Sequence, residues 1–119
     1  MGVQPGKHDI KLRRRADFSL DLQFKDSSNA VINLTGATIY AQVWNEARTT
    51  KTADFAVAYT NRTNGQVSLT LTDVQTTTFA TENDWETQLR YDVMLEDSTG
   101  KREYYLEGVI YVLQGYTAP

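Results

Sequence analysis

The chain contains no cysteine, one histidine and two prolines among its 119 residues. Without cysteine, neither a disulfide nor a thiolate metal site can form, so the fold needs no oxidising compartment. The single histidine, His8, cannot by itself build a metal cluster or a catalytic relay. The small number of prolines and glycines argues against a linker or a disordered chain. These absences favour a folded protein without a histidine- or cysteine-based reaction centre.

Long apolar runs are also missing. No stretch approaches the roughly 18 apolar residues that a membrane helix needs, and residues 1–6 are too short and polar for a secretory signal. We therefore expect a protein located in the cytoplasm, or in an assembly built there. The length of 119 residues and the hydrophobic content of 40% predict one domain over residues 1–119. It would have an N-terminal arm at 1–7 and a C-terminal tail at 114–119.

Positive charge is scarce outside one short segment. The net charge is −3 and the pI is about 5.0, which gives no electrostatic reason to bind nucleic acid or an acidic membrane. The basic run consists of Lys11, Arg13, Arg14 and Arg15. It fits a solvated strand end or a surface contact, because a phosphate-binding stripe would need further basic residues interleaved with aromatic ones.

What the chain does have is a repeating alternation of apolar and polar residues. Phe18, Leu20, Leu22 and Phe24 would share one face of a strand. The same period of two predicts strands at 37–44, 66–71, 88–96 and 101–113, with shorter ones at 31–34 and 55–59. Polar turns separate them at 25–29, 61–65 and 97–100, and 45–54 is expected to be a loop. This spacing predicts an all-β, antiparallel sandwich of seven to eight strands.

One segment departs from the strand pattern. Residues 72–79 contain three consecutive threonines, and Thr72 or Asp73 could cap a single helical turn there. We expect a short helical crossover, with Val74 or Phe79 tucked beneath it. Gly108 within the last strand predicts a bulge or a close backbone approach, and Trp85 is expected to plug one end of the core.

Aromatic residues are the candidates for binding. Alternation places Tyr40, Trp44, Tyr105 and Tyr111 on outward faces. Three interpretations remain open: the rings form a protein interface, they form a carbohydrate platform, or the faces are inverted and the rings belong to the core. The sequence predicts no enzyme, because no serine lies in a nucleophile-elbow context and the carboxylates at Asp92 and Glu96 fit a solvated strand face.

The order of short motifs resembles a known family. Residues 16–44 contain Asp17-Phe18-Ser19-Leu20, then Phe24-Lys25-Asp26, then Asn33-Leu34-Thr35-Gly36. The later part contains Tyr91-Asp92-Val93, a turn at 97–100 and the strand 106–112, and 65–79 adds a strand with a threonine-led helical turn. Together they resemble the small immunoglobulin-like domains of tailed-phage structural proteins, over residues 8–117.

The resemblance implies an immunoglobulin-like sandwich and a non-catalytic virion protein, assembled in the host cytoplasm. The first expectation is an adaptor in the tail, baseplate or fibre attachment; a capsid cement or decoration protein and a carbohydrate-binding module are the alternatives. Partners would be other virion proteins or symmetric copies of the chain, with no cofactor, metal, nucleic acid or membrane. Docking is expected through strand edges and termini, with any fibre region in another chain. The candidate interface residues are His8, Lys11, Arg13, Arg14, Arg15, Trp44, Tyr105 and Tyr111.

Overall fold

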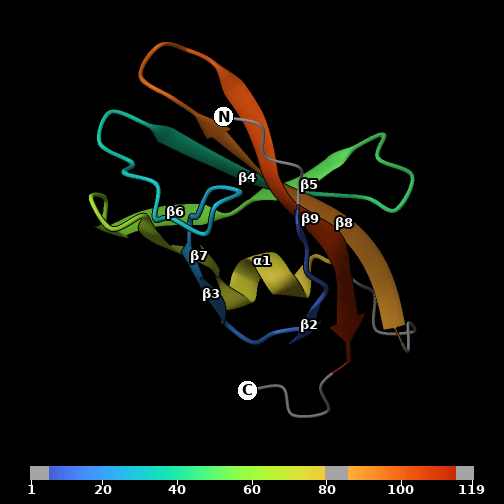
Figure 1. The fold of residues 1–119 in the computed structure, drawn as a ribbon. Helices are drawn as coiled ribbons and strands as arrows, with labels where there is room; N and C mark the ends of the chain where they lie inside the picture. Colours follow the sequence, from blue (N-terminus) through green and yellow to red (C-terminus); the bar gives the residue numbers. More distant parts are fainter. Residues whose placement is uncertain (1–5, 80–85, 115–119) are drawn as a thin grey trace.

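The computed structural model describes residues 6–79 and 86–114, which form two sheets packed face to face (Figure 1). The predicted plug residue Trp85 lies outside these ranges. The elements are β1 Gly6–Lys7, β2 Ile10–Arg13, β3 Phe18–Gln23, β4 Thr38–Trp44, β5 Lys51–Asp54, β6 Ala56–Asn61, β7 Gln66–Leu71, α1 Asp73–Thr77, β8 Glu86–Glu96 and β9 Arg102–Leu113.

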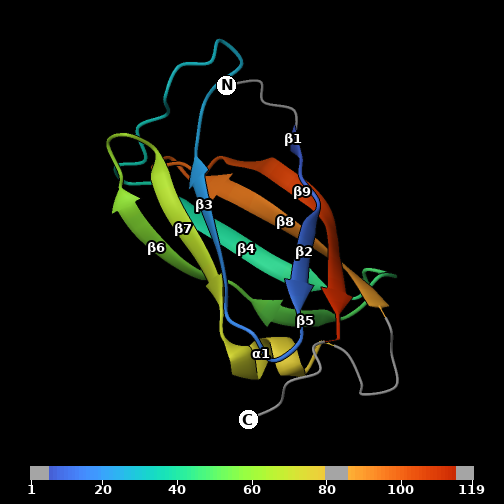
Figure 2. The ribbon, with the colours of Figure 1, turned by 90° about the horizontal axis from the view of Figure 1, so that it is seen from below.

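The strand order is that of an immunoglobulin-like sandwich. The larger sheet runs β9-β8-β4-β5 with antiparallel neighbours, and β1 and β2 pair with β9 at its edge. The smaller sheet runs β3-β7-β6, and Figure 2 shows it lying across the larger one. This is the B-E-D and G-F-C-C′ arrangement of immunoglobulin domains. One correction concerns the N-terminal strands: β1 and β2 run parallel to β9, so the sandwich is not wholly antiparallel.

The core follows the predicted alternation. Inward residues of β4, β7 and β8 are nearly or fully buried, as are Phe24 and Leu34 from the connection between β3 and β4. Phe18, Leu20 and Leu22 of β3 also face the core but are only partly buried, because β3 lies at the edge of the smaller sheet. The buried core residues that alternate in β4, β7 and β8 are Ile39, Ala41, Val43, Val67, Leu69, Leu71, Leu89, Tyr91, Val93 and Leu95.

Two local predictions were wrong. Residues 31–34 form no strand beyond an isolated bridge between Lys25 and Val31, because their backbone groups bond elsewhere. The Ile32 amide donates to Phe24 O, and the Leu34 amide donates to Arg62 O at 2.7 Å. Conversely, the expected loop at 45–54 contains β5. Its residues have a weak strand preference, but the backbone groups along the edge of β4 form hydrogen bonds with them.

The predicted helical turn is confirmed as α1. Thr72 caps it: its side-chain oxygen accepts from the Gln75 amide, and the Gln75 side chain accepts from the Thr72 amide, so the two residues form a capping box. Phe79 is 4% exposed and fills the core, whereas Val74 is 72% exposed. Figure 2 places α1 at one end of the sandwich. Within 6–79 and 86–114 no helix is long and apolar enough to span a membrane.

Candidate protein-interaction surface

The face of the larger sheet that points away from the smaller sheet carries large side chains. We call it the outer face; nothing in the described residues forms a third layer over it. Because neighbouring strands align residue by residue, alternate positions of β4, β8 and β9 project from it together. Its residues are Tyr40, Gln42, Trp44, Arg90, Asp92, Met94, Arg102, Tyr104, Glu107 and Tyr111.

Two adjoining hollows mark this face. The first, about 320 Å³, is lined by residues that include Tyr40, Trp44, Met94 and Tyr104. The second, about 160 Å³, lies around Asp92. Trp44 and Asp92 line both, so the hollows form one shallow depression. Small-molecule pockets usually enclose roughly 300–1,000 Å³ and bury most of the ligand, and this open depression suits a broad contact better.

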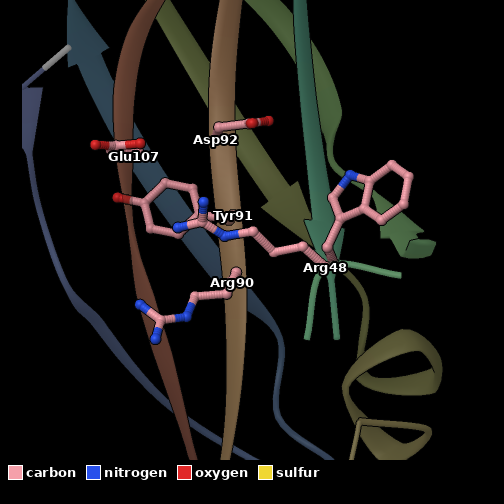
Figure 3. Close-up of a pocket in the computed structure, with 6 residues that line it drawn as sticks. Arg48, Arg90, Tyr91, Asp92 and Glu107 are labelled. Carbon is pink, nitrogen blue, oxygen red and sulfur yellow. The ribbon is translucent and has the colours of Figure 1, made fainter. Parts of the chain in front are cut away.

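Asp92 and Glu107 form an unfavourable pair at the centre of the outer face. They are direct cross-strand partners in β8 and β9, and like charges in such positions repel. Partial burial, and to a lesser degree Glu107, raise the pKa of Asp92, while the positive charge of Arg48 opposes that rise. Asp92, Glu107, Arg48 and Arg90 line the same hollow (Figure 3).

Arg48 reaches this centre from the connection between β4 and β5. Asn45 shapes that connection, since its side-chain oxygen accepts from the amides of Thr49 and Thr50 at 2.8 and 3.2 Å. Arg48 itself adopts a left-handed backbone conformation, with φ of 61°. In Figure 3 its side chain extends from the β4 side across β8.

Four of the predicted interface residues lie on the outer face of the larger sheet. Lys11 and Arg13 are exposed in β2 and align with Tyr111 and Leu113 of β9. They therefore extend the outer face toward the sheet edge, together with Tyr111. Trp44 lies on the same face but in β4, across β9 and β8 from β2, and is half-buried. The sheet thus brings together Lys11, Arg13, Trp44 and Tyr111, which are far apart in the sequence.

The remaining predicted residues lie elsewhere. His8 contributes its backbone, whose carbonyl accepts a hydrogen bond from Tyr91. Arg14 turns toward α1, and its Nε donates to Thr77 O at 2.9 Å. Arg15 follows in the turn after β2, with a left-handed φ of 71°.

Tyr105 was assigned to the wrong face. Its ring packs against Phe24 with centroids 4.2 Å apart, and its hydroxyl accepts from the Lys25 amide at 2.9 Å. The reason is an irregularity in the β8–β9 register between Val93 and Met94, which shifts the alternation in β9 by one residue. Tyr104 therefore takes the outward position and is 49% exposed.

The predicted interface residues also lacked the charged members of the outer face, Arg48, Arg90, Asp92, Arg102 and Glu107. Asp92 was predicted on a solvated strand face, and Arg90 shares that face, but nothing in the sequence linked the face to the aromatic residues of β4. Strand order supplies the link. Arg48 carried no signal because its role depends on the path of a loop. Among the described residues, no group of three or more histidine, aspartate or glutamate side chains could hold a metal ion.

Comparisons with known proteins give no family. No family model matches the chain, and no curated protein matches it. Solved structures give matches that include the Lin-41 filamin domain, at 16% identity and a TM-score of 0.45, covering 88% of this chain and 84% of that one. Murine CRIg matches at 12% identity and a TM-score of 0.42, covering 90% and 92%.

A third match is a VGSC beta subunit from a photo-crosslinking study of multimeric cell-adhesive interactions. It has 11% identity and a TM-score of 0.44, and the match covers 98% of this chain and 99% of that one. At such values the matches carry no argument about function. The immunoglobulin-like fold rests on the strand order and pairing of the chain itself.

Proposed function

We propose that this chain is a non-catalytic docking domain of a tailed-phage virion, an adaptor in the tail, baseplate or fibre attachment. The observation that carries the docking role is the composition of the outer face. Tyr40 and Tyr104 are 43% and 49% exposed, Met94 pairs with both of them across β8, and Trp44 lines the same hollow. Aromatic residues, methionine and arginine are the types enriched where proteins bind each other.

The exposed aromatic rings of the outer face are energetically unfavourable unless a partner covers them. An outward sheet face normally carries polar residues, since exposed apolar surface invites association. Burial of a large aromatic ring contributes favourable free energy in proportion to the apolar area removed from water. A partner that covers Trp44, Tyr40 and Tyr104 gains this contribution, whereas the isolated chain does not.

The sheet edge would add a second contact. Among the residues that the structure describes, β2 pairs with β9 on one side only, so its other side presents backbone groups that a neighbouring strand can pair with. Lys11 and Arg13 project from β2 and suit an acidic neighbour. The virion setting is supported by the motifs at 17–20, 33–36 and 106–112, and a capsid cement or decoration protein would use the same surfaces.

A carbohydrate-binding module is the second candidate. The observation that favours it is the hollow in which the rings of Tyr40, Trp44 and Tyr104 lie beside Asp92 and Arg102. Aromatic faces can stack on sugar rings while charged side chains bond hydroxyl groups. Binding on a glycan array that Trp44→Ala abolishes would favour this candidate over docking to a protein.

The deciding experiment is immunogold labelling of purified particles of the phage that encodes the chain. Label on the tail or fibres is expected, and label over the head would indicate the cement role instead. The Trp44→Ala and Tyr104→Ala double variant should be lost from particles, whereas Val74→Ala, which trims an exposed apolar residue on α1, should incorporate normally. Absence of the chain from particles would refute the virion role.

A further inference from the structure

The charges at the centre of the outer face form no ion pair with one another or with any other residue in 6–79 and 86–114. Other charged residues of this sheet form ion pairs: Arg102 with Glu96 at 2.6 Å, and Lys51 with Asp54 at 3.1 Å. In the described part of the chain, no ion pair or hydrogen bond joins Asp92, Glu107, Arg48 or Arg90 to an opposite charge. Arg48 acts on Asp92 only at longer range.

These four residues line one hollow together with Trp44. Two are acidic and two are basic, so the hollow carries no net charge but presents both signs side by side. A partner that complements it must offer a cation to Asp92 and Glu107 and an anion to Arg90 and Arg48. A basic or an acidic segment alone satisfies only half of the site and repels the other half.

A second copy of the chain presents the same hollow, and therefore offers both signs at the same spacing. Arg90 and Asp92 project from the same face of β8, about 7 Å apart along the strand. We infer that the outer face binds a second copy of this chain, related by a two-fold axis that passes between Arg90 and Asp92. In such an isologous contact Arg90 of each copy lies over Asp92 of the other.

The face is large enough for a stable pair. Five strands lie side by side in it, β2, β9, β8, β4 and β5. At ~4.8 Å per strand and ~3.3 Å per residue along β8, the face measures roughly 24 by 30 Å, or ~700 Å². Specific, stable interfaces bury about 600–1,000 Å² on each partner, and the face falls within that range. Tyr40, Trp44 and Tyr104 flank the central charges and supply the apolar contact.

This inference rests on the proposed function, since it takes the outer face as the docking surface and names its occupant. Copies would then enter an assembly as two-fold pairs joined through their larger sheets. The sheet edges and the exposed face of the smaller sheet would remain available for other chains.

The test is sedimentation equilibrium of purified chain, with a charge-swap design. The native chain should approach twice 13.5 kDa as its concentration rises. Arg90→Glu and Asp92→Arg should each weaken self-association at least ~10-fold, because each places like charges across the two-fold axis. An equimolar mixture of the two variants should associate to within a few-fold of the native chain, since each restores the other's pairing.

Asp21→Arg is the matched control. Asp21 is an exposed residue of β3 in the smaller sheet, so reversing its charge should leave self-association unchanged. Thermal melts of all variants establish that each is folded. A mass that stays at 13.5 kDa up to millimolar concentration would overturn the inference. So would single variants that associate like the native chain, or variants whose mixture fails to associate.

The inference and the proposed function fail differently. A monomeric chain whose incorporation into particles still depends on Trp44 would show that the outer face docks a different protein; the inference would then fail and the function would stand. A rescued charge-swap pair in a chain absent from particles would support the inference and remove the virion role.

Discussion

The hydroxyl group of Tyr91 in β8 donates a hydrogen bond to the backbone carbonyl oxygen of His8. Gly108 lies opposite Tyr91 in β9, and a Cβ atom there would lie 2.0 Å from the same carbonyl oxygen. The Asp9 carboxylate accepts from the Val109 amide at 3.0 Å. These contacts hold His8 and Asp9, the two residues between β1 and β2, against β9. The close backbone approach predicted from Gly108 lies here.

Replacing Gly108 with alanine should detach or displace the N-terminal strands. The new methyl group cannot coexist with the His8 backbone, and overpacking of this kind typically costs ~1–3 kcal/mol. Urea denaturation should show the loss, and amide exchange should quicken over Ile10–Arg13. Gly6→Ala is the control, because its Cβ would meet Leu106 at an ordinary 3.5 Å. Equal stability of both variants would contradict the close approach.

Tyr91→Phe should change how stability responds to alkaline pH. Burial, and then the charge of Asp9, raise the pKa of Tyr91 above its ordinary value of 10.0. Above pH 10 the unfolded chain therefore releases this proton while the native chain keeps it, so stability falls as pH rises. The phenylalanine variant lacks that dependence.

The measurement is the free energy of unfolding of both proteins from pH 7 to pH 11. At pH 7 the variant should be less stable by about 1 kcal/mol, the usual value of a lost hydrogen bond. Above pH 10 the difference in the free energy of unfolding between the native chain and the variant should become smaller. Tyr104→Phe, which removes a hydroxyl from an exposed ring, serves as the control. Parallel curves for the native chain and Tyr91→Phe would refute the assignment.

Asp92→Asn should stabilise the monomer at neutral pH. The pKa of Asp92 is raised from 3.8 by burial and, less strongly, by Glu107. As pH rises above 3.8 the unfolded chain loses this proton first, so ionisation of Asp92 lowers stability. The Asp92→Asn variant does not lose this stability, so it should be more stable than the native chain at pH 7. The difference in stability should disappear near pH 3, where Asp92 is protonated in both states.

Urea denaturation between pH 3 and pH 7, at a dilution where the chain is monomeric, measures the effect. Glu96→Gln is the matched variant, because it removes a carboxylate that Arg102 already pairs and should bring no gain. An Asp92→Asn variant less stable than the native chain at pH 7 would mean that a cation within the chain already satisfies this carboxylate.

The sequence predicted those parts of the fold that depend on alternation alone. Ile39, Ala41 and Val43 face the core in β4 as expected, because one buried face forces a period of two. Burial at the sheet edge could not be predicted: Leu20 is only partly buried, whereas Leu69 is fully buried. Leu69→Ala should therefore cost about 2–5 kcal/mol, and Leu20→Ala less, in paired thermal melts.

The candidate surface was predictable to a lesser degree. Trp44 and Tyr111 were found because alternation placed them outward. Arg48 depends on the path of a loop, and the meeting of Trp44 with Asp92 depends on the pairing of β4 with β8. Such long-range pairing is not encoded in any local period.

The two neighbouring tyrosines of β9 give a direct test of the shifted register. Tyr105 is partly buried, packs on Phe24 and accepts from the Lys25 amide, so Tyr105→Ala should clearly destabilise the fold, by about 2–3 kcal/mol, somewhat less than the loss of a fully buried aromatic residue. Tyr104 is exposed on the outer face, so Tyr104→Ala should barely change the melting temperature but should weaken docking. Paired melts and self-association assays separate the two effects. If Tyr104→Ala were the destabilising variant, β9 would lack the irregularity, Tyr105 would face outward, and the outer face would have to be redrawn around it.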